Sequence, residues 1–173
     1  SLMGRVRTES NFIGARWSKL LINSAFSGLS TVTGGTFGEV SKVRSSRKVA
    51  QRIMKECIDV AKAADIRIEP VQGHKIDKLF DYRGPLKKAF SFALIPVAMK
   101  KHGKLISSML QDLRKGKKCE IDFINGVVSE YGRKYGVATP FNDRTVEIVH
   151  GIEEGKYPIE FKNIGLYSDL PKK

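Results

Sequence analysis

The stretch SSMLQD at residues 107–112, followed by CEIDFING at residues 119–126, decides how this chain folds. Each stretch places a polar or acidic residue where a helix can start and continues into apolar residues at helical spacing. A third stretch, GVATPFN at residues 136–142, adds a glycine that ends one helix and a Thr-Pro pair that opens the next. Together they predict helices over about 107–115, 119–135 and 140–154.

The same helical period runs through the first half of the chain. Asn11 can cap a helix over about 12–32, which Gly34-Gly35 ends, and a short segment follows at 36–42. Ser45 or Ser46 can cap a second long helix that reaches about residue 64. A loop over 66–73 and a short helix near 76–80 come next.

A further helix begins at Gly84-Pro85, because proline is tolerated in a first turn. We expect Pro96 to kink it, because proline lacks the backbone donor and clashes with the preceding turn. Its expected buried line is Leu86, Phe90, Leu94 and Val97. No alternating apolar and polar run is long enough to require a strand, so the predicted fold class is all-α, a helical bundle.

With 173 residues, the chain suits one domain with a real hydrophobic core. We expect residues 12–156 to form the helical domain. Residues 1–11 are interpreted as an expression remnant or an interdomain linker, and residues 157–173 as an irregular tail.

The charge and cysteine content limit the possible classes of function. The net charge of +13 fits either a nucleic-acid surface or solvated helix faces. The aromatic residues are not interleaved with the basic ones as base stacking would require, which argues against nucleic acid. No apolar run is long enough to span a membrane. Cys57, Cys119 and three scattered histidines give neither a disulfide framework nor a metal signature, so we expect a reducing cytoplasm.

One polar stripe interrupts the otherwise apolar first helix. Lys19, Asn23 and Ser27 follow one another at intervals of four residues and therefore project from one helix face. The stripe is either a solvated surface or a ligand groove with one cation and two hydrogen-bonding groups.

Two residues at predicted helix starts can be interpreted either as structural caps or as part of a ligand site. Ser108 opens a Ser-x-x-Gln capping box, and a helix N-terminus can also hold a carboxylate. Glu120 complements a helix dipole at the start of the following helix. Gly126 lies inside that helix, where we expect it to allow close packing of another helix.

In this order, these segments resemble the C-terminal helical domain of the ketopantoate reductase (2-dehydropantoate 2-reductase) family, a fold shared with proteins like 6-phosphogluconate dehydrogenase. The family's Trp-x-Lys-Leu-x-x-Asn segment is matched at 17–23, and its Ser-Met-Leu-Gln-Asp segment at 108–112. Its Glu-Ile-Asp-x-Ile-Asn-Gly segment is matched at 120–126, and its Gly-hydrophobic-x-Thr-Pro-x-Asn segment at 136–142.

The resemblance implies an NADPH-dependent reduction of 2-dehydropantoate to pantoate. It implies that Lys19 is the general acid and that Glu120 orients the lysine or the substrate. It further implies that Asn23 and Ser108 hold the substrate, with Ser27 in the place of a second asparagine. Another family asparagine is replaced here by Leu105, which leaves other 2-oxo acids open as substrates.

The Gly-x-Gly-x-x-Gly fingerprint of nucleotide binding does not occur in this sequence. We therefore expect NADP to be bound mainly by a separate N-terminal Rossmann domain, and this chain alone to bind no cofactor and to be inactive. The expected partners are that domain, a small 2-oxo acid and, as a further option, a second copy in a homodimer. Two alternatives remain at this stage: a basic helical nucleic-acid-binding domain and a non-catalytic helical dimerisation module.

Overall fold

The computed structural model describes residues 11–71 and 73–171, and no β-strand occurs among them. An isolated antiparallel bridge joins Val71 to His74. The all-α prediction is confirmed. The expected linker at 1–11 lies outside the described residues except for Asn11. In chain order the helices are α1 (Phe12–Thr33), α2 (Phe37–Lys42), α3 (Arg44–Ala63), α4 (Ile76–Phe80), α5 (Pro85–Ala98), η1 (Lys100–His102), α6 (Ser108–Arg114), α7 (Ile121–Tyr135), α8 (Pro140–Glu153) and η2 (Phe161–Tyr167).

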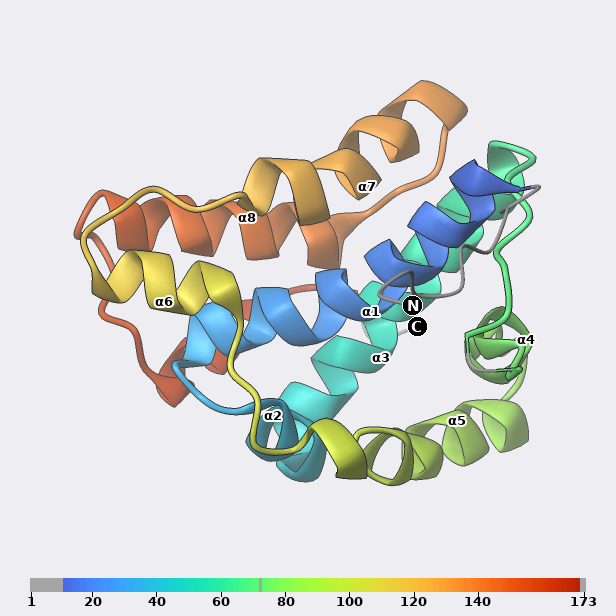
Figure 1. The fold of residues 1–173 in the computed structure, drawn as a ribbon, viewed down its shortest axis with the longest axis horizontal. Helices are drawn as coiled ribbons and strands as arrows, with labels where there is room; N and C mark the ends of the chain where they lie inside the picture. The colour runs from blue at the N-terminus through green and yellow to red at the C-terminus, as the bar shows by residue number, and fades with distance from the viewer. Residues whose placement is uncertain (1–10, 72, 172–173) are drawn as a thin grey trace, which may run out of the picture.

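Helix α1 is the centre of the fold, as Figure 1 shows, and it contacts α2, α3, α6, α7, α8 and η2. The Asn11 side chain caps its start by accepting a hydrogen bond from the Gly14 amide at 3.1 Å. Gly34 ends it with a φ of 72°, in the left-handed region that glycine adopts without strain. Both ends of the predicted first helix are therefore confirmed.

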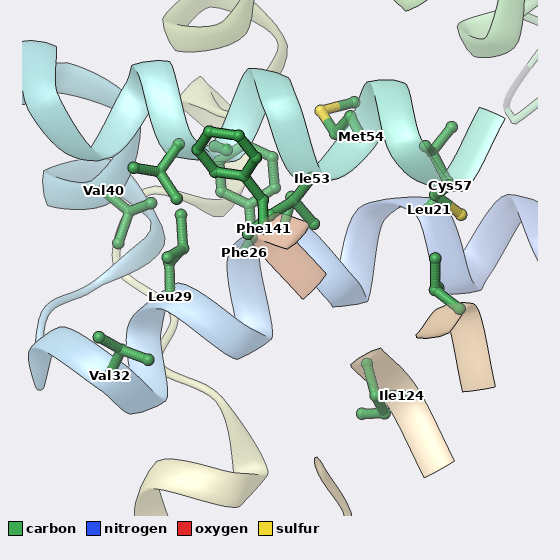
Figure 2. Packing of buried hydrophobic residues seen from close by; sticks show 14 of the residues in the cluster. Leu21, Phe26, Leu29, Val32, Val40, Ile53, Met54, Cys57, Ile124 and Phe141 are labelled. Atoms are coloured by element: carbon green, nitrogen blue, oxygen red, sulfur yellow. The ribbon is translucent and has the colours of Figure 1, made fainter. Parts of the chain in front are cut away.

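The hydrophobic core lies mainly between α1 and α3 (Figure 2). Leu21 and Leu29 of α1 and Ile53 of α3 are fully buried. Other helices add side chains to this core, including Val40 of α2, Ile124 of α7 and Phe141 of α8. Burial of a large apolar side chain contributes roughly 1.5–3 kcal/mol, so this contact stabilises the whole bundle.

The start of α3 differs from the prediction. Its N-cap is Val43, and the Ser46 hydroxyl donates to the carbonyls of Val40 at 2.8 Å and Val43 at 3.2 Å instead of capping amides. Ser45 is exposed inside the first turn. The prediction that Ser45 or Ser46 caps α3 is wrong, because the Ser46 hydroxyl bonds to a carbonyl of α2.

The predicted buried line of α5 is wrong for three of its four residues, and only Leu94, which is half-buried, packs against the core. Leu86, Phe90 and Val97 are 88%, 59% and 67% exposed, and the buried residues of this helix are Ser91 and Ile95. Gln51 of α3 fixes this orientation, because its Nε2 donates to Ser91 Oγ at 2.5 Å. The helix continues through Pro96 and ends two residues later.

A buried polar network connects α1, α3, α7 and α8. Asn125 Nδ2 donates to the Ser24 carbonyl at 3.0 Å and to Asn142 Oδ1 at 2.9 Å. The amide of Asn142 and its Nδ2 in turn donate to Glu56 Oε2 at 2.9 and 2.7 Å. Since each buried polar group needs partners, this network fixes how the four helices meet.

The close helix packing that was expected at Gly126 occurs at Gly28 instead. A Cβ on Gly126 would touch only its own helix, with Asp122 Cβ at 3.4 Å, so the prediction of close helix packing there is wrong. A Cβ on Gly28 would lie 2.7 Å from Asn125 Oδ1 and 3.1 Å from Thr145 Cγ2. Gly28 is therefore the residue that lets α1 approach its neighbours.

The segment after Tyr157 is not the irregular tail that we expected. It contains η2, whose Ile164 and Tyr167 belong to the hydrophobic core. Asn163 Nδ2 donates to the Val32 carbonyl at 3.0 Å and so joins η2 to α1. Aromatic residues at 157, 161 and 167 were the available signal, but without a helical period they did not indicate a buried element.

Among the described residues, none of the helices combines the length and the apolar character that crossing a membrane requires.

Candidate functional site

A groove of about 340 Å³ runs along the N-terminal half of α1, and Lys19 and Asn23 both line it. Ala15, Ser18 and Ile22 of the same helix form the rest of the α1 wall, and Glu69, Pro70 and Val71 form the opposite wall. Lys19 is exposed and Asn23 is half-buried. The four-residue spacing thus brings the predicted cation and the predicted amide into one cavity.

The opposite wall is held tightly against α1. The Ser18 hydroxyl donates to the Glu69 carbonyl at 2.6 Å, and Asn11 Nδ2 donates to the Arg67 carbonyl at 2.8 Å. A Cβ on Gly14 would lie 2.0 Å from that same carbonyl oxygen, so only glycine permits this approach. The groove therefore has a fixed shape set by α1 and the loop that follows α3.

Glu69 is a groove residue that the sequence did not reveal. Its Oε1 accepts a hydrogen bond from Asn11 Nδ2 at 2.7 Å, which holds the carboxylate at the groove wall. The groove therefore combines an ammonium group, a carboxylate and a carboxamide with apolar walls. No local pattern could indicate this, because Glu69 meets Asn11 across 58 residues of sequence.

Ser27 continues the row one turn beyond Asn23, outside the groove itself, and is half-buried. Thr31 is the next member, and its hydroxyl lies 2.8 Å from Ser107 Oγ. The Ser107 amide also donates to Ser30 Oγ at 3.2 Å. These bonds fix the start of α6 beside Thr31, at the far end of the row that begins with Lys19. From Lys19 to Thr31 the row spans roughly 18 Å, at 1.5 Å per residue.

Ser107, not Ser108, caps α6, and this corrects the predicted capping box. Ser107 Oγ accepts from the Leu110 amide at 3.0 Å, while Ser108 is the first residue of the helix and is exposed. The hydroxyl of Ser108 is therefore not used as the cap.

Glu120 is the exposed N-cap residue of α7, without a side-chain capping bond. Helix α7 runs antiparallel to α1, because Asn125 bonds to Ser24 whereas Tyr131 packs edge-on against Trp17 at 5.3 Å. Glu120 precedes both contacts and so lies toward the C-terminal half of α1, away from Lys19. It is not among the residues that line the groove.

Within residues 11–71 and 73–171, no cluster of His, Cys, Asp or Glu side chains has the arrangement of a metal site. Burial raises the pKa of the Cys57 thiol above its usual range, and that of Cys119 to about 12. Both cysteines are free, and neither is activated as a nucleophile.

The described residues thus form an all-α domain whose central helix brings a lysine and an asparagine into one groove. The family description "Ketopantoate reductase PanE/ApbA C terminal" matches residues 11–153, and the chain belongs to this family.

Curated relatives agree with the family match. The chain is 27% identical to 2-dehydropantoate 2-reductase of Pyrobaculum aerophilum over 87% of its own length and 47% of that protein. It is 29% identical to the Shigella flexneri protein of the same name over 96% of its length and 46% of the relative. The chain thus spans about half the length of the curated relatives that it matches.

Solved structures show the same fold. A PanE/ApbA family ketopantoate reductase from Ralstonia eutropha is 28% identical with a TM-score of 0.68, covering 87% of this chain and 44% of the other. A ternary structure of D-mandelate dehydrogenase with NADH and anilino(oxo)acetate is also 28% identical, with a TM-score of 0.67, covering 86% and 43%.

Proposed function

We propose that this chain is the substrate-side domain of an NADPH-dependent reductase of 2-oxo acids, with 2-dehydropantoate as the first candidate substrate. In that reaction the product is pantoate, and the proposed role of the enzyme is in pantothenate biosynthesis in the cytoplasm. The nucleotide would be bound mainly by a Rossmann domain, whose glycine fingerprint this sequence lacks.

The observation that carries the proposal is the placement of Lys19 beside Asn23 in a groove, in a chain whose family match covers residues 11–153. A solvated stripe would need no opposite wall. Here Glu69, Pro70 and Val71 form one, and hydrogen bonds to α1 hold it in place.

The role proposed for Lys19 follows from the charge that the reaction creates. NADPH supplies a hydride to the carbonyl carbon of a 2-oxo acid. The electron pair of the C=O double bond then moves onto oxygen, where an ammonium group can stabilise it and donate the proton. Lys19 is exposed, so the neutral amine that results can take up a proton from solvent.

The remaining site residues are proposed to position the substrate. Asn23 can donate to a substrate hydroxyl or carboxylate from within the groove. Ser27 and Ser108 would act further along the row, where the start of α6 meets α1. Glu120 is proposed to act on the substrate rather than on Lys19, since α7 places it toward the other end of α1.

Two substitutions relative to the family pattern leave 2-oxo acids other than 2-dehydropantoate as candidate substrates. Ser27 and the exposed Leu105 stand where the family resemblance implies asparagines. The similarity to a D-mandelate dehydrogenase makes an aryl 2-oxo acid such as phenylglyoxylate the second compound to assay.

The test is Lys19→Ala in a two-domain protein that joins this chain to its nucleotide-binding domain. We expect kcat to fall on the order of 10²- to 10⁴-fold, because the lost group acts on the transition state. Lys19→Arg should restore only part of it, because a guanidinium keeps its proton and has another shape. Asn23→Ala should act more on KM than on kcat.

Lys42→Ala removes an exposed lysine of α2 and is the matched control. It should leave kcat unchanged. Unchanged turnover in a folded Lys19→Ala variant would refute the role of Lys19 and favour a scaffold without catalytic residues.

A further inference from the structure

A second cavity, of about 360 Å³, lies away from the Lys19 groove, between α3 and the loop that joins α4 to α5. Arg52 and Lys55 of α3 line one side, and Arg83 and Lys88 line the other. Asp59 is the one carboxylate in the lining. Figure 1 shows this region at the edge of the molecule, where α5 runs beneath α3.

The cations in this cavity outnumber the anions. The Lys55 ammonium pairs with Asp59 at 2.5 Å and also with Asp81, which lies outside the lining, at 3.7 Å, and the lining itself keeps a net positive charge. The pKa of Lys88 is lowered, first by burial and then by the positive charges of Arg52 and Lys48. Like charges held close together repel one another, and a bound anion would reduce that repulsion.

The N-terminus of helix α5 lies at this cavity, because Gly84 and Lys88 are among its lining residues. Helix α5 begins here with Gly84 as an N-cap that makes no side-chain hydrogen bond and with Pro85 in its first turn. Its first turn contains no acidic residue, so no carboxylate of the helix itself offsets the amides of Leu86 and Lys87 or the positive end of the helix dipole. Gln51 Nε2 fixes this turn on α3 by donating to the Lys88 carbonyl at 2.7 Å.

The buried hydroxyl of Tyr82 also indicates a ligand in this cavity. Its side chain lines the cavity and is 7% exposed, and its hydroxyl is buried without a hydrogen-bond partner of normal geometry. The neighbouring Arg52 can only donate to it, because a guanidinium has no acceptor. The hydroxyl proton therefore lacks an acceptor, which the oxygen of an anion would supply. The ammonium groups of Lys55 and Lys88 lie over the Tyr82 ring, 5.9 and 5.7 Å from its centroid.

We infer that this cavity, which we call the α3–α5 cavity, binds the phosphate group of a small phosphorylated metabolite. A phosphate carries two negative charges and several acceptor oxygens, which suits guanidinium, ammonium, hydroxyl and amide donors placed around one space. The volume lies in the range of small-ligand sites and leaves room for more than the phosphate alone. The site is separate from the Lys19 groove and does not depend on the function proposed above.

The test uses the ¹⁵N-labelled chain with inorganic phosphate as the probe, at constant ionic strength set with chloride. Saturable NMR shifts are expected at the amides of Leu86 and Lys87. The double variant Arg52→Gln/Lys88→Gln should weaken binding at least tenfold, and Tyr82→Phe should weaken it about threefold. Arg83→Gln changes an exposed loop residue, and it serves as a second variant if the double variant does not fold.

The control pair Lys101→Gln/Lys104→Gln removes the same charge from exposed positions outside the cavity and should leave binding unchanged. Equal weakening in this control, or shifts that do not saturate, would show diffuse attraction to a basic protein and overturn the inference. A short single-stranded oligonucleotide distinguishes the phosphate sources. Tight competition at the same amides, weakened by the control pair, would assign the phosphate to nucleic acid and refute the small-metabolite proposal.

Discussion

Glu56 is buried where α3 meets the first turn of α8, and it is the residue on which that contact depends. Its Oε1 accepts from the Phe141 amide at 2.9 Å, and its Oε2 accepts from the Asn142 amide at the same distance. These bonds satisfy amides that every helix start leaves without partners. Burial nevertheless raises the pKa of Glu56 to about 7, because it outweighs the hydrogen bonds that lower it.

This raised pKa predicts a specific dependence of stability on pH. Between about pH 4.5 and 7 the unfolded chain releases the Glu56 proton while the folded protein retains it, so the contribution of this group falls as pH rises. The loss is on the order of 3 kcal/mol once the pH exceeds 7. Urea unfolding of the wild type and of Glu56→Gln across this range measures it. Other titrating groups cancel in the difference, and a difference independent of pH would contradict the prediction.

Gly28 gives a prediction with an internal control. Gly28→Ala places a Cβ 2.7 Å from the Asn125 side chain and should destabilise the fold by about 1–3 kcal/mol, because the buried network must shift. Gly126→Ala meets only ordinary contacts and should be stabilising, by up to about 1 kcal/mol. The melting temperatures of the two variants test this prediction. Equal changes in stability would show that the close approach of helices at Gly28 does not contribute to the stability of the fold.

At the scale of elements, α5 shows how a helix can keep its period and still be placed in the wrong orientation. Leu86, Phe90 and Val97 are spaced as a buried line would be, yet these side chains are exposed and another face of the helix is buried. Ile95 and the hydrogen bond from Gln51 to Ser91 decide the orientation. Spacing alone shows that an apolar face exists, but which neighbour covers it depends on contacts distant in sequence.

The observed orientation of α5 can be checked by substitution. Ile95→Ala removes a fully buried side chain and should cost about 2–5 kcal/mol. Phe90→Ser changes a side chain that is 59% exposed and should stay within about 0.5 kcal/mol of wild type. Denaturant midpoints of both variants provide the measurement. A larger loss for Phe90→Ser than for Ile95→Ala would support the orientation expected from the sequence.

At the scale of the whole molecule, sequence reasoning was most successful where signals are local. The caps at Asn11 and Gly34 depend on hydrogen bonds between residues close in sequence, and the helix between them, α1, was predicted closely. The four-residue spacing likewise brought Lys19 and Asn23 into one groove. Glu69 in the site escaped prediction because its partners Asn11 and Ser18 lie 58 and 51 residues away, and η2 in the core escaped because it lacks a helical period and is joined to α1 across 131 residues.

The element η2 carries the last prediction, because it decides where the folded unit ends. The Tyr167 ring stacks on Phe141 at 6.3 Å, and its hydroxyl lies 2.9 Å from Thr145 Oγ1. Tyr167→Ala should therefore cost about 3–5 kcal/mol, the range for removal of a buried aromatic side chain.

Tyr167→Phe separates packing from hydrogen bonding. It keeps the ring and should cost only about 1–3 kcal/mol, because Thr145 loses one buried partner but can still donate to the Phe141 carbonyl at 2.7 Å. Lys162→Ala changes an exposed side chain of the same element and is the control. Urea unfolding of the three variants measures the free energies. Tyr167→Ala with the stability of the control would mean that η2 is a dispensable tail and that the folded unit ends near residue 156, as the sequence suggested.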